Sequence, residues 1–537
     1  MLLFALACSS EPTPSAEVDP VEDLGPIDGD TLVVAASFDP GNLNSIVAPY
    51  ALSGYYIGAT QLGLVERRVD TDGLLHVPGV AESWSWSEDG LTTTFILRDD
   101  IVFSDGHPLS AEDVAFTYEL ILDPEVASNW HALEKKLESV EVIDEHTVAF
   151  TWKQPGLHTN LMDEFRLGVL PKHVLAEADR GSLRGHEYSR NPLSTASWKL
   201  TAWDKEARLV LEPNGLVTGR PPARLDRVIT KIIPEYATQL IELENGSVDM
   251  VFTVELADIP GIEADHPEIR LLREEASGME YVGWNMKDPI LEDARVRLAL
   301  THAIDVERLI EDAYSVDDRV FASPCHGTVT PSTGGWYNTD IERLAFDQQQ
   351  SMALFDEAGW TDTDGDAIRD RDGQPLSITL VIQNSIPRSE KLAIRIQAML
   401  REVGVDLQIQ ALEPNLFSSQ ARAHEFQAIL WGFGANYKVD PTIQWHSTGQ
   451  YNWMGFSDPE VDRLLEEAMS TSDLSDAQAK VREVQAIVYE AQPATFLVWQ
   501  DTVGAIHTRF EGVKQNPYTA FQELETWWVP ASKQKYR

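Results

Sequence analysis

An acidic loop, DTDGDAIRDRDG, carries residue types that can bind a metal ion. Its first half places carboxylates at alternate positions, Asp362, Asp364 and Asp366, which is the spacing of the first ligands in an EF-hand calcium loop. The second half departs from that pattern, because Ala367 replaces the turn glycine and Gly373 stands where the bidentate Glu belongs. The loop predicts at most a weak calcium site, with an acidic hairpin loop as the alternative. No other cofactor is expected.

Aromatic side chains gather between residues 431 and 453. They supply the flat apolar walls that a small-molecule cleft uses, and Trp faces also stack well on sugar rings. Core packing is the alternative for at least half of them. The five aromatic residues are Trp431, Phe433, Tyr437, Trp445 and Trp453.

Motifs for catalysis are missing from the sequence. It contains no H-E-x-x-H, no G-x-S-x-G, no P-loop and no G-x-G-x-x-G in a strand context. Cys325 lies beside His326, but no base with an orienting partner is visible, so a small buried or half-buried thiol is the favoured interpretation. We therefore expect that the protein is not an enzyme.

The elements that must position these residues alternate between strands and helices. Residues 229–254 read as strand, helix and strand, the rhythm of a parallel sheet covered by helices. Asp293 is a plausible N-cap for a helix with an apolar face of period 3.6, and residues 376–412 repeat the strand, helix and strand order. The chain then returns through residues 496–506 toward its first half. Two crossings between two α/β lobes would form a hinge.

Residues 77–124 encode a compact local unit. Trp and Ser alternate from Ser83 to Ser87, and a Thr- and Phe-rich strand follows an Asp-Gly turn, which predicts a hairpin. Ser110 and Asp113 form a capping box in front of a helix that Pro124 ends.

Several blocks of the chain resemble one protein family. Six sequence motifs stand in the order found in the extracytoplasmic solute-binding proteins of peptide- and nickel-type ABC importers. These motifs are AESW, DGLT, F-x-DG-x-PL-x-AEDV, NPLSTASWKL, RVRLALTHAID and WGFGANYKVDP. About four-fifths of the chain is covered by these blocks. The resemblance implies an α/β, two-lobed type II periplasmic-binding-protein fold with an extra domain inserted in the first lobe.

The resemblance also implies a division of the chain. The expected segments are 1–8, a lipoprotein signal remnant; 9–29, a disordered tether; 30–67 with 190–277 and 508–537, lobe I; 68–189, the inserted domain; and 278–507, lobe II. Asp249 is interpreted as a structural residue in lobe I.

The ligand loop is where the sequence departs from the family. In several peptide binders of the family, an acidic residue just before the Tyr of this loop receives the ligand's α-ammonium, and here that position is Asn436. An amide brings no charge, and a charge-assisted pair is about twice as strong as a neutral one. Asp440 precedes Pro441 and is favoured as a turn residue. The predicted ligand contacts are Asn436, Trp431, Phe433, Tyr437, Trp453 and Phe38.

The charge of the chain limits its partners. The 537 residues include 42 Lys and Arg against 86 Asp and Glu, a formal net charge of −44. Such a surface repels nucleic-acid phosphates and anionic lipids, so no nucleic-acid partner is expected. The expected partners are a small solute and the permease subunits of an ABC transporter, and the protein is expected to be a monomer.

The first eight residues, MLLFALAC, resemble the end of a bacterial lipoprotein signal whose start lies upstream. Cys8 is the predicted lipidation site, and the Pro-, Glu- and Ser-rich residues after it suit a tether. If Cys8 carries lipid, Cys325 has no partner for a disulfide. We expect a periplasmic or cell-surface protein that is lipid-anchored to the membrane.

Three functions remain open from the sequence. The leading one is a lipid-anchored binder that captures a peptide or similar small solute between two lobes and delivers it to a permease. An oligosaccharide-binding member of the same family is the first alternative. A secreted carboxylate-dependent hydrolase, which needs two acidic residues about 5 to 10 Å apart in the cleft, is the second.

Overall fold

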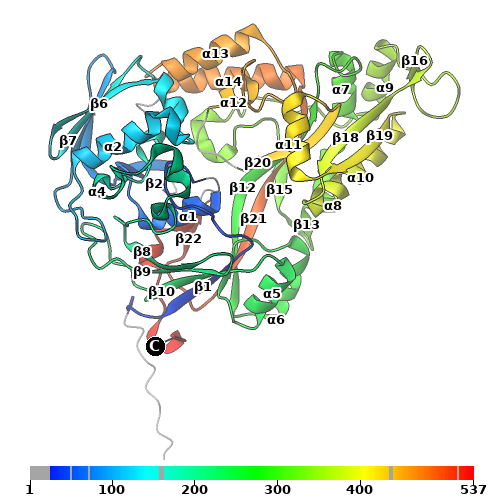
Figure 1. Ribbon diagram of the computed structural model, residues 1–537. Helices are drawn as coiled ribbons and strands as arrows, with labels where there is room; N and C mark the ends of the chain where they lie inside the picture. The colour runs from blue at the N-terminus through cyan, green and yellow to red at the C-terminus, as the bar shows by residue number, and fades with distance from the viewer. Residues whose placement is uncertain are drawn as a thin grey trace, which may run out of the picture.

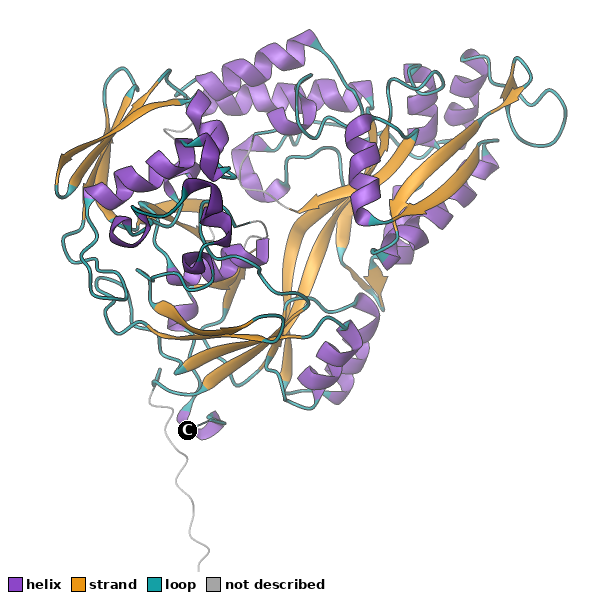
Figure 2. Ribbon diagram, in the orientation of Figure 1, coloured by secondary structure: helices purple, strands orange, loops and turns teal. Residues whose placement is uncertain are grey.

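A computed structural model describes residues 25–48, 51–70, 73–156, 162–434, 440–516 and 519–536. The described chain forms two α/β lobes joined by long strands, with a smaller domain on one side (Figure 1). Helices cover both faces of the central sheet (Figure 2).

Eleven strands of the described residues form one continuous sheet in the order β19-β18-β20-β12-β21-β11-β1-β10-β9-β8, with β15 also paired to β21. Their bounds are β1 Thr31–Ala36, β8 Trp198–Asp204, β9 Arg208–Pro213, β10 Arg227–Ile232, β11 Met250–Val251, β12 Ile269–Trp284, β15 Ala322–Pro324, β18 Ser377–Gln383, β19 Asp406–Leu412, β20 Ala428–Gly434 and β21 Ala494–His507.

Two long antiparallel strands, β12 and β21, join the lobes. In lobe I, β21 pairs with β11, which is parallel to β1, and in lobe II β12 pairs with β20. The ladder between the two strands is irregular between Glu274 and Gly278, where Ala276 has a φ of 48°. A bulged, twisted stretch of two strands between two packed lobes is suited to bending.

Helices cover both sides of this sheet, and their starts follow local sequence signals. Asp293 caps α7 by accepting a hydrogen bond from the Arg295 N–H, and Asp305 caps α8, so the predicted Asp293 cap is confirmed. The helix bounds are α1 Ala51–Thr60, α5 Tyr236–Glu244, α6 Ile259–Asp265, α7 Ala294–His302, α8 Val306–Ala313, α9 Gln348–Glu357, α10 Pro387–Glu402, α11 Pro414–Ala423, α12 Thr442–Trp445, α13 Pro459–Ser470 and α14 Leu474–Ala491.

The smaller domain packs α2 (Ala111–Leu122) on a four-stranded sheet, at the left of Figure 1. The predicted hairpin is β4 with β5, and the capping box is confirmed because the Asp113 carboxylate accepts a hydrogen bond from the Ser110 N–H at 2.9 Å. The remaining bounds are β4 Ala81–Trp86, β5 Thr92–Leu97, β6 Leu137–Asp144, β7 Thr147–Trp152 and α4 Lys172–Leu175.

The core of this domain also takes residues from outside the expected range 68–189. Ile46, Val47, Leu62 and Leu64 are buried in the same hydrophobic cluster as Phe95 and Phe150. The expected boundary after residue 67 falls inside β2. The small hairpins are β2 Val65–Asp70 with β3 Gly73–Pro78, β13 Ser315–Val316 with β14 Arg319–Val320, β16 Asp370–Arg371 with β17 Gln374–Pro375, and β22 Lys514–Asn516 with β23 Thr519–Gln522.

A buried ionic cluster fastens the C-terminal segment to lobe I. The Arg509 guanidinium pairs with Asp30 and, at 2.9 Å, with Asp249, and all three side chains are at most 4% exposed. Asp249 also accepts a hydrogen bond from the Val33 N–H at 2.9 Å, and the Asp30 carboxylate accepts one from the Lys535 N–H. Asp249 thus ties β1, β11 and the C-terminal segment together.

Within the described part of the chain, none of the helices has the length and apolar character needed to cross a bilayer.

Candidate functional site

A pocket of about 250 Å³ lies in lobe II at the carboxyl end of β20. Its floor is formed by strand residues close to the point where β12 and β21 enter lobe II, since Gly434 of β20 pairs with Gly278 of β12. The lining residues are Met279, Thr328, Val329, Thr330, Thr333, Trp431, Phe433, Gly434, Asp440, Pro441, Ile443, Gln444, Tyr451 and Trp499.

The smaller domain, expected from the sequence as the inserted domain, contacts lobe II on the side of this pocket. Strand β3 approaches the 3-10 helix η7 (Pro331–Trp336), which contributes Thr333 to the pocket. Phe38 is 52% exposed just beyond the carboxyl end of β1 in lobe I. Ligands of open α/β sheets bind beyond the carboxyl ends of the strands, so both lobes present suitable edges.

The pocket walls are aromatic. The Trp431 and Phe433 rings meet edge to face with their centroids 6.1 Å apart, and the Phe433 and Tyr451 rings lie 5.8 Å apart. Trp431, Phe433 and Tyr451 are half-buried, so each has one surface in the core and another in the pocket. Such walls hold apolar side chains or flat groups by contact area rather than by charge.

Unpartnered polar atoms surround these walls. Among the described residues, Trp431 Nε1, Trp453 Nε1 and the Tyr281 hydroxyl are buried and have no hydrogen-bond partner. Leaving a buried polar group unpaired costs about 1–3 kcal/mol. Of these three residues, Trp431 alone lines the pocket, so a ligand acceptor that reached its Nε1 would supply the missing partner.

The structure places some of the predicted ligand contacts in the pocket lining and others outside it. Trp431 and Phe433 line the pocket as predicted, but Trp453 does not. Trp453 is 3% exposed, and its ring packs 5.3 Å from that of Trp431, so it supports the wall from behind. A direct contact between Trp453 and the ligand stays a prediction. Asn436, Tyr437 and Cys8 lie outside the described residues.

Of the fourteen residues that line the pocket, sequence reasoning named two as ligand contacts, Trp431 and Phe433. Met279 and Trp499 come from the two crossing strands, and Thr328 and Thr333 come from a segment far from the ligand loop. Tyr451 was the one with a local signal, because it lies in the same aromatic stretch as Trp453. The others become neighbours of Trp431 only through the sheet order.

Asp440 is the one carboxylate among the described residues that line this pocket. It accepts a hydrogen bond from the Thr442 N–H at 3.1 Å, which is the turn role expected for an Asp before a Pro. A single carboxylate does not provide the pair that glycoside hydrolysis requires.

A second pocket of about 250 Å³ lies in lobe I, between α1, β2 and residues 519–525. It is ionic, and burial raises the pKa of its Glu66 carboxyl, which lies 3.9 Å from Arg220. The charged lining residues are Glu66, Arg67, Arg68, Arg166, Arg220, Glu523 and Glu525. Sequence reasoning found none of them.

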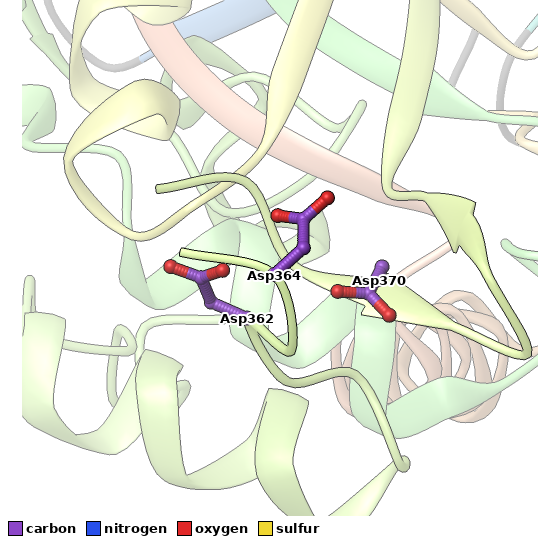
Figure 3. A group of neighbouring side chains, drawn as sticks. All are labelled: Asp362, Asp364 and Asp370. Atoms are coloured by element: carbon purple, nitrogen blue, oxygen red, sulfur yellow. The ribbon is translucent and has the colours of Figure 1, made fainter. Parts of the chain in front are cut away.

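The acidic loop brings three carboxylates together, although not the predicted three. Asp362, Asp364 and Asp370 have oxygen atoms within 4.8 Å of one another. Figure 3 shows these three side chains. Asp366 is not in this group, and its carboxylate accepts a hydrogen bond from the Ile368 N–H. Asp370 instead comes from β16, which folds back onto the loop. Calcium binding at this loop stays a prediction.

Cys325 is buried and its thiol donates a hydrogen bond to the Gly327 carbonyl. Burial raises the pKa of this thiol to about 12. A thiol that stays protonated is a poor nucleophile, which agrees with the structural role expected from the sequence.

The lobes, the crossing strands and the pocket can now be compared with known proteins. The family described as bacterial extracellular solute-binding proteins, family 5 Middle, matches residues 76–455, well over half of the chain. The chain belongs to this family.

Relatives within the family differ in what they bind. The oligopeptide-binding protein AppA of Bacillus subtilis (strain 168) is 27% identical over 543 residues, which cover 98% of this chain and 97% of AppA. The nickel-binding periplasmic protein of Escherichia coli (strain K12) is 27% identical over 427 residues, 76% of this chain and 78% of that protein.

Solved structures of family 5 proteins confirm the fold. AppA from Bacillus subtilis in complex with a nonapeptide has a TM-score of 0.79 and 26% identity, covering 94% of this chain and 100% of that one. NikZ from Campylobacter jejuni in complex with Ni(L-His) has a TM-score of 0.79 and 23% identity, covering 93% and 99%. The predicted α/β two-lobed type II fold of an ABC-importer binding protein is therefore correct.

Proposed function

We propose that this protein captures a peptide between its two lobes and delivers it to the permease of an ABC transporter. The lobe II pocket carries this proposal, because its walls are aromatic and its Trp431 N–H is buried without a partner among the described residues. A peptide supplies the matching groups, since every residue brings a carbonyl acceptor and side chains can occupy the apolar walls. The likeness to oligopeptide-binding AppA over nearly the whole chain supports the same choice.

Transport follows from closure of the lobes. A ligand that contacts both lobes stabilises the closed arrangement by the difference between its affinities for the closed and open forms. The permease would then recognise the closed form, and the binding protein itself would catalyse no reaction. The proposed site holds the ligand by contacts on lobe II and by the edge of lobe I that carries Phe38.

An oligosaccharide is the alternative ligand. The neutral Asn436 and the Trp-rich walls are compatible with a sugar, because Trp faces stack on sugar rings and no charge is needed.

Thermal unfolding with three ligand pools tests the proposal. We expect a pool of short peptides to raise the melting temperature, because a ligand at a hundredfold excess over its Kd stabilises the folded state by about 2.7 kcal/mol. Pools of oligosaccharides and of nickel chelates should leave it unchanged. A shift with oligosaccharides alone would establish the alternative, and three flat responses would refute solute capture.

We also propose that a lipid on Cys8 anchors the protein to the membrane. Support comes from the apolar residues before Cys8 and the tether composition after it. When the full-length gene is expressed in a bacterium that processes lipoproteins, the protein should partition into a detergent phase. The Cys8→Ser variant should move to the aqueous phase, and equal partitioning of both proteins would exclude this anchor.

A further inference from the structure

Glu274 lies on β12, in the stretch where the two strands that join the lobes, β12 and β21, belong to neither lobe. On the lobe I side, this stretch begins at Val503, whose carbonyl accepts a hydrogen bond from the Val254 N–H. On the lobe II side, it ends at Gly278, which pairs with Gly434 at the edge of the aromatic pocket. Glu274 pairs with Thr502 between these two points. It therefore lies between the lobes, five residues before the pocket-lining Met279 on β12.

Strand alternation gives the direction of its side chain. Residues two apart in a strand share a face, so Glu274 lies on the same face as Leu272. Leu272 packs against the hydrophobic cluster that contains Tyr55, Phe252 and Phe521. Tyr55 and Phe521 also line the lobe I pocket. Glu274 thus faces the aromatic edge of lobe I rather than the helices α5 and α6.

The Glu274 carboxylate has no partner in the described part of the chain. Neither a hydrogen bond nor an ion pair reaches it, although it is half-buried. Burial alone raises the pKa of this carboxyl to about 7. A carboxylate in such surroundings loses hydration that no described residue replaces.

Charged residues on the neighbouring strands of the described chain make contacts with other groups. On β21, Asp501 accepts hydrogen bonds from Arg273 and from the Ala276 N–H. On β22, which packs against β12, Lys514 pairs with Glu523. On β12 itself, Arg270 donates to the Phe510 carbonyl.

Glu280, farther along β12, contrasts with Glu274. It is also buried, but its carboxylate accepts hydrogen bonds from the Tyr314 hydroxyl at 2.5 Å and from the Arg388 guanidinium at 3.0 Å. Of the buried or half-buried carboxylates along these two strands, Glu274 alone is left without a partner among the described residues.

We propose that Glu274 binds the positively charged amine of the ligand, which for a peptide is the α-ammonium at its N-terminus. This inference rests on the proposed peptide function. An ammonium group would supply the missing hydrogen-bond donors and a compensating charge, and a charge-assisted bond is about twice as strong as a neutral one. It also gives the ligand a carboxylate partner in a chain whose ligand loop carries the neutral Asn436.

Glu274→Gln tests the proposal, with the exposed neighbour Glu275→Gln as the matched control. The probes are short synthetic peptides without Lys, Arg or His, offered with a free and with an acetylated N-terminus, and native mass spectrometry measures the bound fraction. Wild-type protein and Glu275→Gln should prefer free peptides by at least about tenfold, the ratio given by one pKa unit of interaction. Glu274→Gln should lose that preference and keep its melting temperature.

The preference should also depend on pH. Below about pH 7 the Glu274 carboxyl takes up a proton and no longer attracts a cation, so the preference of the wild type should rise several-fold between about pH 6 and about pH 7. The Glu274→Gln variant should show no such rise. An unchanged preference in Glu274→Gln would overturn the inference and leave peptide binding intact, whereas wild-type protein that binds neither form would overturn the proposed function as well.

Discussion

Replacing Arg509 by Leu lowers the free energy of unfolding of the protein by about 3–5 kcal/mol, as expected when one partner of a buried ion pair is removed. The substitution leaves Asp30 and Asp249 without a counter-charge, and both carboxylates are 1% exposed. It also removes hydrogen bonds that hold the C-terminal segment against β1 and β11. Denaturant unfolding followed by circular dichroism measures the loss.

Arg509→Lys and Arg463→Leu are the controls for this expectation. Lys keeps the charge but cannot reproduce the forked contacts of a guanidinium, so it should recover only part of the stability. Arg463 pairs with Glu460 and Glu467 on the exposed surface of α13, and its loss should hardly move the unfolding midpoint. Equal midpoints for Arg509→Leu and Arg463→Leu would show that the buried cluster does not hold the fold together.

Replacing Trp431 by Ala should reduce peptide affinity by about thirtyfold to a hundredfold, because truncating an interfacial Trp commonly costs 2 kcal/mol or more. Trp431 forms one wall of the pocket and carries a buried N–H that has no partner in the described residues. Trp431→Phe keeps a ring but removes that donor, so its affinity should fall between those of the wild type and Trp431→Ala. Isothermal titration with a peptide selected from the pool measures these differences.

Trp284→Phe is the matched control for the pocket. Trp284 is fully buried on the opposite face of the lobe II sheet, where its indole N–H donates to the Thr495 hydroxyl at 3.1 Å. This substitution should lower the melting temperature without changing the Kd. If Trp431→Ala and Trp284→Phe weakened binding equally, the aromatic pocket would not be the binding site.

Local sequence signals predicted the elements well, since the interactions that set them span only a few residues. The capping box of Ser110 and Asp113 and the cap at Asp293 both satisfy N–H groups within three residues. The strand, helix and strand order indicated an α/β fold, and the sequence motifs that resemble the family indicated the two lobes. Lobe boundaries were harder, because Ile46 and Leu64 pack in the core of a domain expected to begin after residue 67.

The binding site was predicted only in part, because most of it depends on distant segments. Trp431 and Phe433 could be found because they lie in one aromatic run. Met279 and Trp499 join them only because β12 pairs with β20 on one side and with β21 on the other. Glu274 is notable only because the structure shows that its carboxylate has no partner among the described residues. Residue type did not separate the buried Trp453 from the pocket-lining rings, because alternation and burial decide which ring faces the pocket.

Native mass spectrometry of the protein with the free-amine peptide pool tests the central claim most directly. Capture between two closing lobes predicts a single bound peptide per chain, with the bound fraction strongly reduced in Trp431→Ala and unchanged in Trp284→Phe. A protein that binds no peptide, or that binds several per chain with no effect of Trp431→Ala, would contradict the account.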